Sequence, residues 1–169
     1  MTAKSNKRKD EQAPKTVNKK AYHNFELVEK FEAGLGLLGT EVKSLRAGQA
    51  DLDGSYARIR EGQCWLVGAK IAQYQQAGQT SSAGGSLTGH EPARNRKLLL
   101  HKSEIHRIRI KLEQRGFTLV PLQIYFNKRG FAKVELALAT GKRKFDKRRT
   151  ITERQQKRDL DRDKKKYRK

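Results

Sequence analysis

Apolar and polar residues alternate over short stretches in the middle of this chain, which is the pattern of half-buried β-strands. Residues 25–31 alternate in this way, and residues 56–59 and 64–71 are rich in β-forming side chains. The Glu61-Gly62 pair between the latter two stretches supplies turn residues and predicts a β-hairpin.

A second hairpin is predicted over residues 118–139, with its turn at residues 127–130. Residues 40–48, TEVKSLRAG, are interpreted as another short strand followed by a turn. Short strands with turn signals about every ten residues are typical of a small antiparallel barrel or sandwich. We therefore expect a mainly β fold.

One helix is predicted beside these strands. Ile105, Ile108 and Leu112 are spaced so that they form one apolar stripe on a helix. Ser103 is the expected N-cap, and Gly116 is the expected stop. The helix would cover part of the small barrel.

The glycine-rich stretch GLGLLG, residues 34–39, matches the dinucleotide-binding fingerprint. That fingerprint functions only where the glycines lead into a helix whose N-terminal N–H groups hold a pyrophosphate. Residues 40–48 are β-branched and reach another glycine within nine residues, which leaves no room for such a helix. We therefore reject nucleotide binding and assign these glycines to tight bends or bulges in a closing barrel.

Both ends of the chain are polar and basic. Residues 1–20 are interpreted as a flexible arm, residues 21–140 as the folded domain, and residues 141–169 as a tail. Within the domain, residues 77–93 are small and polar and predict a mobile loop. The tail alternates charge without a continuous apolar stripe, so a free helix there would lack packing to stabilise it.

The net charge of +21 is informative about binding partners, because it favours a polyanion as the partner. The tail alone carries fifteen Lys or Arg and five acidic residues. The chain shows neither a wide apolar face for a membrane surface nor an apolar run long enough to span one. A single cysteine and the lack of a signal-peptide pattern favour the cytosol.

Candidate catalytic chemistry is weak. The four histidines and Cys64 lack metal-ligand spacing, and Asp51 and Asp53 sit in a turn-like DLDG sequence. Cys64 is expected to be a buried apolar residue, and Trp65 and Phe117 are expected to pack in the core. We expect no enzyme activity, no metal and no cofactor.

Basic clusters next to predicted elements are better candidates for function. They comprise Lys19 and Lys20, Lys43 and Arg46, and Arg94, Arg96 and Lys97. Lys and Arg contact phosphates, while rings such as those in NKKAYH (residues 18–23) can stack on unpaired bases. Any one cluster could equally be a solvated face, but together they favour RNA or DNA.

Three longer strings carry a specific resemblance: NKKAYHNFELVEKFEAGLGLLGTEVKSLRAG, RKLLLHKSEI and GKRKFDKRR. Their order and spacing resemble the family of SsrA-binding proteins, also called small protein B, over residues 18–150. The resemblance implies a bacterial partner of transfer-messenger RNA (tmRNA), with an antiparallel barrel resembling an OB fold and flanking helices. We expect a monomer. It further implies binding to the tRNA-like domain near its D-loop, and delivery of that RNA to stalled ribosomes for trans-translation. The tail is then expected to be disordered when free and helical along the empty mRNA path from the small-subunit decoding centre.

The resemblance also implies roles for individual positions. The implied RNA contacts are Asn18, His23, Glu32, Leu99 and Lys133. The segment implied to act in the decoding site contains Lys142, Phe145, Asp146, Lys147, Arg148 and Arg149. Phe145 departs from the Tyr or His common in the family, and Phe stacks without hydrogen bonding. Two other readings stay open from the residues alone: a ribosomal or nucleoid structural protein, and an RNA-processing enzyme.

Overall fold

The computed structural model describes residues 14–74, 90–114, 116–143, 155 and 159–160. Its strands are β1 (Thr16–Val17), β2 (Phe25–Leu35), β3 (Ala50–Asp51), β4 (Tyr56–Arg60), β5 (Gln63–Val67), β6 (Lys70–Ile71), β7 (Arg96–Leu99), β8 (Phe117–Phe126) and β9 (Ala132–Gly141). Its helices are α2 (Lys19–Asn24), α3 (Gly39–Arg46) and α4 (Lys102–Glu113).

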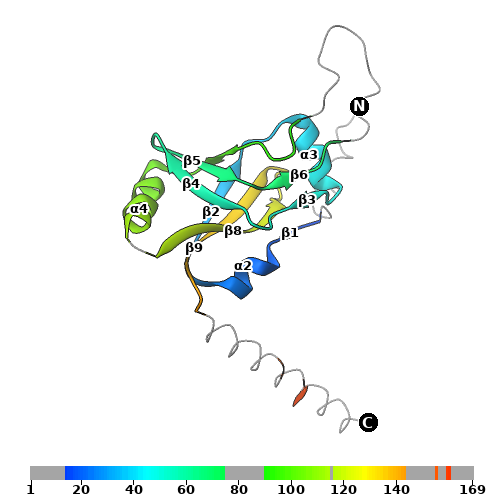
Figure 1. Cartoon of the computed structure of the whole chain (residues 1–169). Coiled ribbons are helices and arrows are strands. Elements are labelled where there is room, and N and C mark those ends of the chain that lie inside the picture. The colour runs from blue at the N-terminus through cyan, green and yellow to red at the C-terminus, as the bar shows by residue number, and fades with distance from the viewer. Residues whose placement is uncertain (1–13, 75–89, 115, 144–154, 156–158, 161–169) are drawn as a thin grey trace, which may run out of the picture.

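The strands form a closed antiparallel ring (Figure 1). The order is β8-β4-β5-β7-β2-β9, and β9 pairs again with β8, so the sheet has no long free edge. The short β1 adds to the outside of β8, while β3 and β6 pair separately. This arrangement confirms the predicted mainly β barrel with flanking helices.

Both predicted hairpins are present. Glu61 and Gly62 have φ of 53° and 69°, so the β4–β5 turn places two residues in the left-handed region. That geometry matches the right-handed twist of the strands it joins. In the β8–β9 turn, the Asn127 carboxamide oxygen accepts hydrogen bonds from the N–H groups of Arg129 and Phe131.

Apolar side chains fill two spaces, one inside the ring and one outside it. Inside lie alternate residues of the strands, including Leu66, Leu98, Leu136 and Leu138, all essentially inaccessible to solvent. The outer cluster lies between α2 and the β8–β9 ribbon and contains Ala21, Val120, Leu122, Ala137 and Ala139. Thus α2 covers one stretch of the outer face of β8 and β9 and leaves the rest to solvent.

The flexible arm predicted over residues 1–20 is wrong for residues 16–20. Asn18 is buried, and its Oδ1 accepts from the Ala21 N–H at 3.0 Å, which caps α2. Its Nδ2 donates to the carbonyls of Leu52 and Pro121 at 3.0 and 3.1 Å. One amide therefore ties the start of α2 to β8 and to the turn that follows β3. Residues 1–13 lie outside the described part of the chain.

The segment TEVKSLRAG is helical, not a strand and turn as predicted. Glu41 accepts a hydrogen bond from the Leu38 N–H at 2.8 Å and so caps α3. Glu41 and Leu45, one turn apart, are both buried, whereas the β-branched residues suggested a strand. The reason given for rejecting a dinucleotide site, the lack of a helix, is therefore wrong. However, an acidic side chain occupies this helix start, which opposes a phosphate there.

The other boundary predictions need smaller corrections. The helix α4 begins at Lys102, with His101 at the N-cap position and its N–H donating to Glu104, instead of being capped by Ser103. Gly141 is the last residue of β9, and the Lys142 N–H donates to the Asn24 carbonyl at 2.9 Å. The predicted tail therefore begins inside the folded domain.

The end of the predicted loop 77–93 is also fixed. His90 is buried, its Nδ1 lies 2.9 Å from the Thr40 hydroxyl, and its Nε2 lies 3.1 Å from the Ile71 carbonyl oxygen. The Ile71 N–H donates to the Pro92 carbonyl. Residues 90–93 are thus part of the packed domain, and the remainder of that loop lies outside the described residues.

A buried ionic cluster joins α3 to the start of β7. Glu41 and Arg96 are both fully buried, with Glu41 Oε1 2.9 Å from Arg96 Nε and 2.8 Å from Arg94 Nε. Arg96 also donates to the carbonyls of Ala69, Pro92 and Arg94. Burial alone would raise the pKa of Glu41, but the hydrogen bonds from Arg94 and Leu38 and the charge of Arg96 hold it below its usual value.

We expect Glu41→Ala to lower the free energy of unfolding by about 3–5 kcal/mol, because it leaves Arg96 buried without its carboxylate. Urea denaturation measures the change. Glu113→Ala is the matched control, since it removes a carboxylate from an exposed ion pair with Arg109 and should cost less than about 1 kcal/mol. Equal losses in the two variants would contradict this role for Glu41.

The same cluster predicts a pH dependence. A carboxyl whose pKa is lowered by folding stabilises the fold above its unfolded pKa, near 4.5, and the contribution disappears as the pH falls through the lower folded value. The stability difference between the unmodified chain and Glu41→Gln should therefore be full at pH 7 and shrink below pH 4.5. A difference that stays constant down to the acid transition would contradict the lowered pKa.

Candidate nucleic-acid interface

Three residues that are far apart in the sequence meet on the outer side of the ring. Glu32 and Gly34 lie on β2. Gly34 is paired with Lys133 of β9 on one side and with Leu99 of β7 on the other. Directly paired residues point to the same side of a sheet, so Lys133 and Leu99 flank Gly34 on one face. We call the surface formed by Glu32, Gly34, Leu99 and Lys133 the β2 face.

An ionic network orders the β2 face. Glu32 Oε1 lies 3.1 Å from Lys133 Nζ, and the Tyr125 hydroxyl of β8 donates to Glu32 Oε2. These hydrogen bonds, first from Tyr125 and then from Lys133, lower the pKa of Glu32. Burial and the contact with Glu32 raise the pKa of Tyr125 to about 12, so its hydroxyl remains a donor at neutral pH. Glu32 therefore positions a cation and a phenol.

Gly34 gives the β2 face its shape. A Cβ added at Gly34 would lie 3.2 Å from Leu99 Cβ, which is too close for ordinary packing. The glycine therefore permits the Leu99 side chain to lie against β2 while the residue stays 58% exposed. A close approach of two strands, instead of the predicted tight bend, is what this glycine provides.

The helix α2 adds basic and ring-bearing residues. Lys19, Lys20 and His23 are exposed, and Lys20 forms an ion pair with Asp53. Lys142 Nζ donates to the Tyr22 carbonyl at 3.2 Å, which fixes the start of the C-terminal segment beside this helix. These predicted site residues are accessible, but they belong to the α2 side of the barrel.

Two of the basic residues that were predicted to bind RNA are not exposed at the surface. Arg96 is fully buried and Arg94 is half-buried against Glu41, so both serve the ionic cluster described above. Asn18 has its amide engaged inside the domain, so we reject it as a direct RNA contact. Arg94 and Arg96 were interpreted as surface cations although the core needs them, whereas Asn18 was implied only by the family resemblance.

The basic residues of α3 lie on aromatic rings. Lys43 Nζ is 5.2 Å from the centre of the Tyr74 ring, and the Arg46 guanidinium is 5.4 Å from that of Phe126. Each of these contacts places the charged group of an exposed side chain over an aromatic ring. Lys97 of β7 is likewise exposed.

The predicted decoding-site residues Phe145, Asp146, Lys147, Arg148 and Arg149 lie outside the described residues. Beyond Arg143 the structure describes three residues, 155, 159 and 160, in helical conformation. The Gln155 carboxamide donates to Asp159 one turn later.

The described residues offer little for catalysis or metal binding. Among them, no three His, Cys, Asp or Glu side chains gather as a metal site. Cys64 is fully buried, as predicted, and burial raises its pKa to about 11, so its thiol stays protonated. No helix of this part of the chain is long and apolar enough to cross a membrane.

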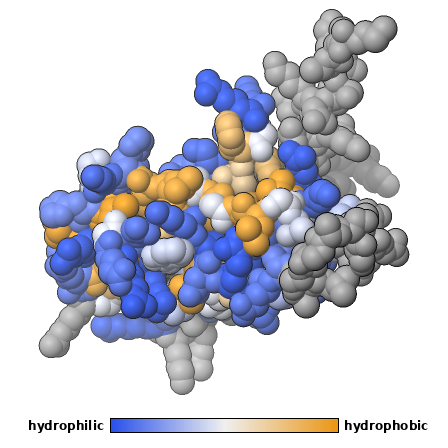
Figure 2. All heavy atoms as spheres, turned by 90° about the horizontal axis from the view of Figure 1, so that it is seen from above, coloured by the Kyte–Doolittle hydropathy of each residue, from blue (hydrophilic) through white to orange (hydrophobic). Residues whose placement is uncertain are grey.

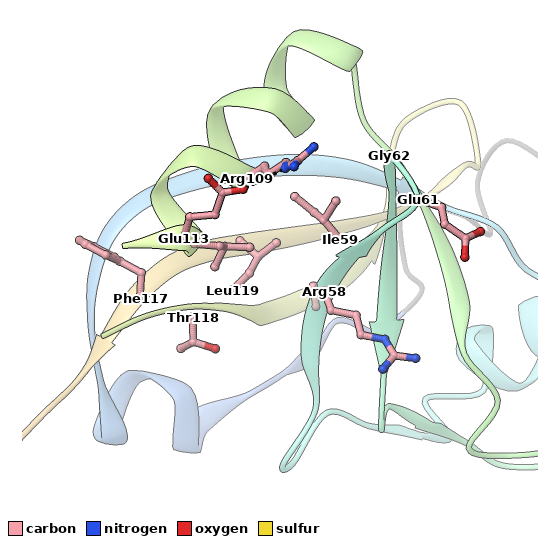
Figure 3. A pocket seen from close by; sticks show the side chains of 11 residues that line it. Arg58, Ile59, Glu61, Gly62, Arg109, Glu113, Phe117, Thr118 and Leu119 are labelled. Carbon is pink, nitrogen blue, oxygen red and sulfur yellow. Dashed lines mark hydrogen bonds and ion pairs between the residues drawn. The ribbon is translucent and has the colours of Figure 1, made fainter. Parts of the chain in front are cut away.

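A groove of about 580 Å³ opens where β4 and β8 separate, because these strands pair only at Ala57 and Leu119. Ile59, Leu112 and Leu119 contribute apolar lining, and Arg109 and Glu113 stand at the rim on α4 (Figure 3). The two rim residues are paired with each other. The groove is thus a partly apolar seam in the barrel without convergent polar groups.

Tyr125 is a site residue that was not predicted from the sequence. The predicted turn at residues 127–130 would place Tyr125 opposite Ala132, whereas the register of β8 and β9 pairs it with Lys133. The face of the barrel seen in Figure 2 is mostly hydrophilic, with separate hydrophobic patches between the polar residues. A closed antiparallel barrel with exposed cations, an aliphatic platform and aromatic rings defines a small OB-like protein of the nucleic-acid-binding class.

Comparisons with known proteins assign the chain more narrowly. Residues 15–166 match the family model of the SmpB protein, and the chain belongs to this family. It is 50% identical over 145 residues to the SsrA-binding protein of Syntrophobacter fumaroxidans, with 86% of this chain and 84% of that protein covered. It is also 50% identical over 115 residues to the SsrA-binding protein of Thermus thermophilus, with 68% and 74% covered.

A solved structure gives the same assignment. It is described as tmRNA-SmpB on a journey to the center of the bacterial ribosome. One of its chains is 49% identical to this one, covers 82% of this chain and 95% of its own length, and superposes with a TM-score of 0.62. The resemblance inferred from the sequence is therefore confirmed.

The β2 face predicts a measurable carboxyl titration. The pKa of Glu32, followed by NMR of its side-chain carbon, should lie below 4.5. Tyr125→Phe removes the largest cause of that shift and should move the pKa back towards 4.5. Tyr56→Phe removes a hydroxyl elsewhere and should leave it unchanged. If the pKa of Glu32 is the same in Tyr125→Phe as in the unmodified chain, the phenol does not order this carboxylate.

Proposed function

We propose that this chain is an RNA-binding adaptor that binds the tRNA-like domain of tmRNA through the β2 face and delivers it to stalled ribosomes for trans-translation. One observation carries the proposal. Glu32, Leu99 and Lys133, each singled out by the family resemblance, come from three strands and meet around Gly34. The relatives' names and the ribosome-bound structural neighbour support the same RNA and the same site of action.

The chemistry of the face suits a structured RNA. Lys133 supplies a cation for a phosphate, and Leu99 supplies an aliphatic surface for a base or ribose. Glu32 holds Lys133 before binding, so less side-chain freedom is lost when a phosphate arrives. This account assigns Glu32 the ordering of a nearby cation instead of a direct contact with a base edge. The role is binding without catalysis, in the cytoplasm where ribosomes work.

The C-terminal segment has a separate part in the proposal. We assign ribosome contact to Phe145, Asp146 and the basic residues 147–149, with the remainder of the tail becoming helical where an mRNA path is empty. Fifteen cations in residues 141–169 support this assignment, because binding to a polyanionic groove would remove their mutual repulsion. Lys142, by contrast, is engaged with the Tyr22 carbonyl and anchors the segment to the barrel.

Lys133→Ala should weaken binding to the tRNA-like domain about ten-fold and reduce the slope of log affinity against log salt by about 0.7–0.9. Fluorescence anisotropy of labelled RNA at several salt concentrations measures both quantities. Lys111→Ala is the matched control, since it removes the same charge from a comparable Lys–Glu pair between α4 and β2. Equal effects of the two substitutions would indicate general electrostatic attraction, as expected of a structural protein.

A double-mutant cycle tests the ordering role of Glu32. If Glu32 acts through Lys133, Glu32→Gln weakens RNA binding alone but adds nothing to Lys133→Ala. Independent losses that add in the double variant would instead place Glu32 in contact with the RNA itself.

Removing residues 144–169 should leave most affinity for the tRNA-like domain and abolish tagging on stalled ribosomes. The truncation point preserves β9 and the Lys142 contacts with α2, so the barrel is not cut. RNA affinity and tagging of a stalled translation product are measured on the same preparation. Loss of RNA affinity on truncation, with the fold intact, would show that the tail is the main RNA-binding element.

A further inference from the structure

Trp65 lies on the outside of the ring, at the centre of a row of side chains from three neighbouring strands. On β5 it is paired with Arg58 of β4 on one side and with Lys97 of β7 on the other. Its neighbours Cys64 and Leu66 are fully buried, whereas Trp65 is only half-buried. Alternation along the strand therefore directs Trp65 outward, which corrects the prediction that it packs in the core.

Two cations flank this indole without a competing partner. Arg58 and Lys97 are exposed, and within the described residues neither has an ion pair or a side-chain hydrogen bond. The Arg58 side chain points away from Arg109 and Glu113 of α4 (Figure 3). By contrast, Arg60 on the same strand is paired with Glu61. The cations beside Trp65 are therefore available to a ligand.

The row continues into the β2 face. Lys97 and Leu99 are two residues apart on β7 and point to the same side. Gly36, the residue after the end of β2, lies beside Lys97. A Cβ added at Gly36 would lie 3.3 Å from the Lys97 carbonyl oxygen. Tyr56, 43% exposed, lies diagonally across from Trp65 on β4. An aromatic ring between two cations thus extends the surface around the barrel.

An aromatic ring flanked by basic residues on barrel strands is the arrangement that stacks a base and contacts its phosphates. We propose that the indole of Trp65 stacks on an unpaired nucleotide, with Arg58 and Lys97 binding the adjacent phosphates. This inference rests on the proposed function for its RNA, but it uses different residues from the β2 face. An unpaired nucleotide can come from the tRNA-like domain or from ribosomal RNA, and the chemistry is the same.

The chain contains a single tryptophan, so its fluorescence reports on this site alone. The full chain is titrated in parallel with the tRNA-like domain, with isolated small ribosomal subunits, with oligouridylate and with an RNA duplex of equal length. We expect oligouridylate to quench Trp65 and the duplex to leave it nearly unchanged, since only an unpaired base can stack. Quenching by the tRNA-like domain or by the subunit then identifies the natural source.

Substitutions give the second measurement. Trp65→Leu should weaken oligouridylate binding about ten-fold, and Trp65→Phe should retain more of the affinity because it keeps a ring. Arg58→Gln and Lys97→Gln should each weaken it and lower the salt slope, whereas Arg60→Gln, the matched control, should not. Thermal unfolding of each variant verifies that the barrel is intact.

The outcomes separate this inference from the proposed function. Anisotropy that shows binding of the tRNA-like domain, with no change of Trp65 fluorescence in any arm, would overturn the stacking site and leave the proposed function standing. Quenching by oligouridylate without specific binding of the tRNA-like domain would support the site and count against the proposed function. Equal quenching by duplex and oligouridylate would also overturn the stacking inference.

Discussion

The buried carboxylate of Glu41 is the contact on which the arrangement of the barrel depends. It caps α3 through the Leu38 N–H, and it binds Arg96 at the start of β7 and Arg94 just before it. Arg96 in turn donates hydrogen bonds to the carbonyls of Ala69 and of Pro92, which precedes β7. Because an unpaired buried charge is costly, this cluster fixes where β7 begins. The position of β7 then determines where Lys97 and Leu99 lie against β2.

The division of the outer surface follows from how much of it α2 covers. Where α2 lies on β8 and β9, the outward residues are apolar, such as Leu122 and Ala137. Beyond the helix the same two strands carry Tyr125 and Lys133, which point outward and are ordered by Glu32. One pair of strands therefore supplies both a packing surface and a binding surface, and the change between them occurs within a few residues of each strand.

The sequence predicted the parts of this fold that have a regular pattern and missed those that depend on buried polar groups. Alternation and turn residues were sufficient for both hairpins and the barrel. The helix α3 was missed because its β-branched residues suggested a strand and its buried face contains the charged Glu41. Arg96 was mistaken for a surface cation because its partner lies far away in the sequence. The residues of the β2 face came from the family resemblance, whereas their meeting around Gly34 required the register of three strands.

The central claim is that structured RNA binds the outer face of β2, β7 and β9. Lysine acetylation followed by mass spectrometry, with and without the tRNA-like domain, tests it most directly on the unmodified chain. The account predicts that the RNA protects Lys133, while Lys70, exposed on the separate β3–β6 sheet, reacts as before. Protection of Lys70 with Lys133 left fully reactive would contradict it.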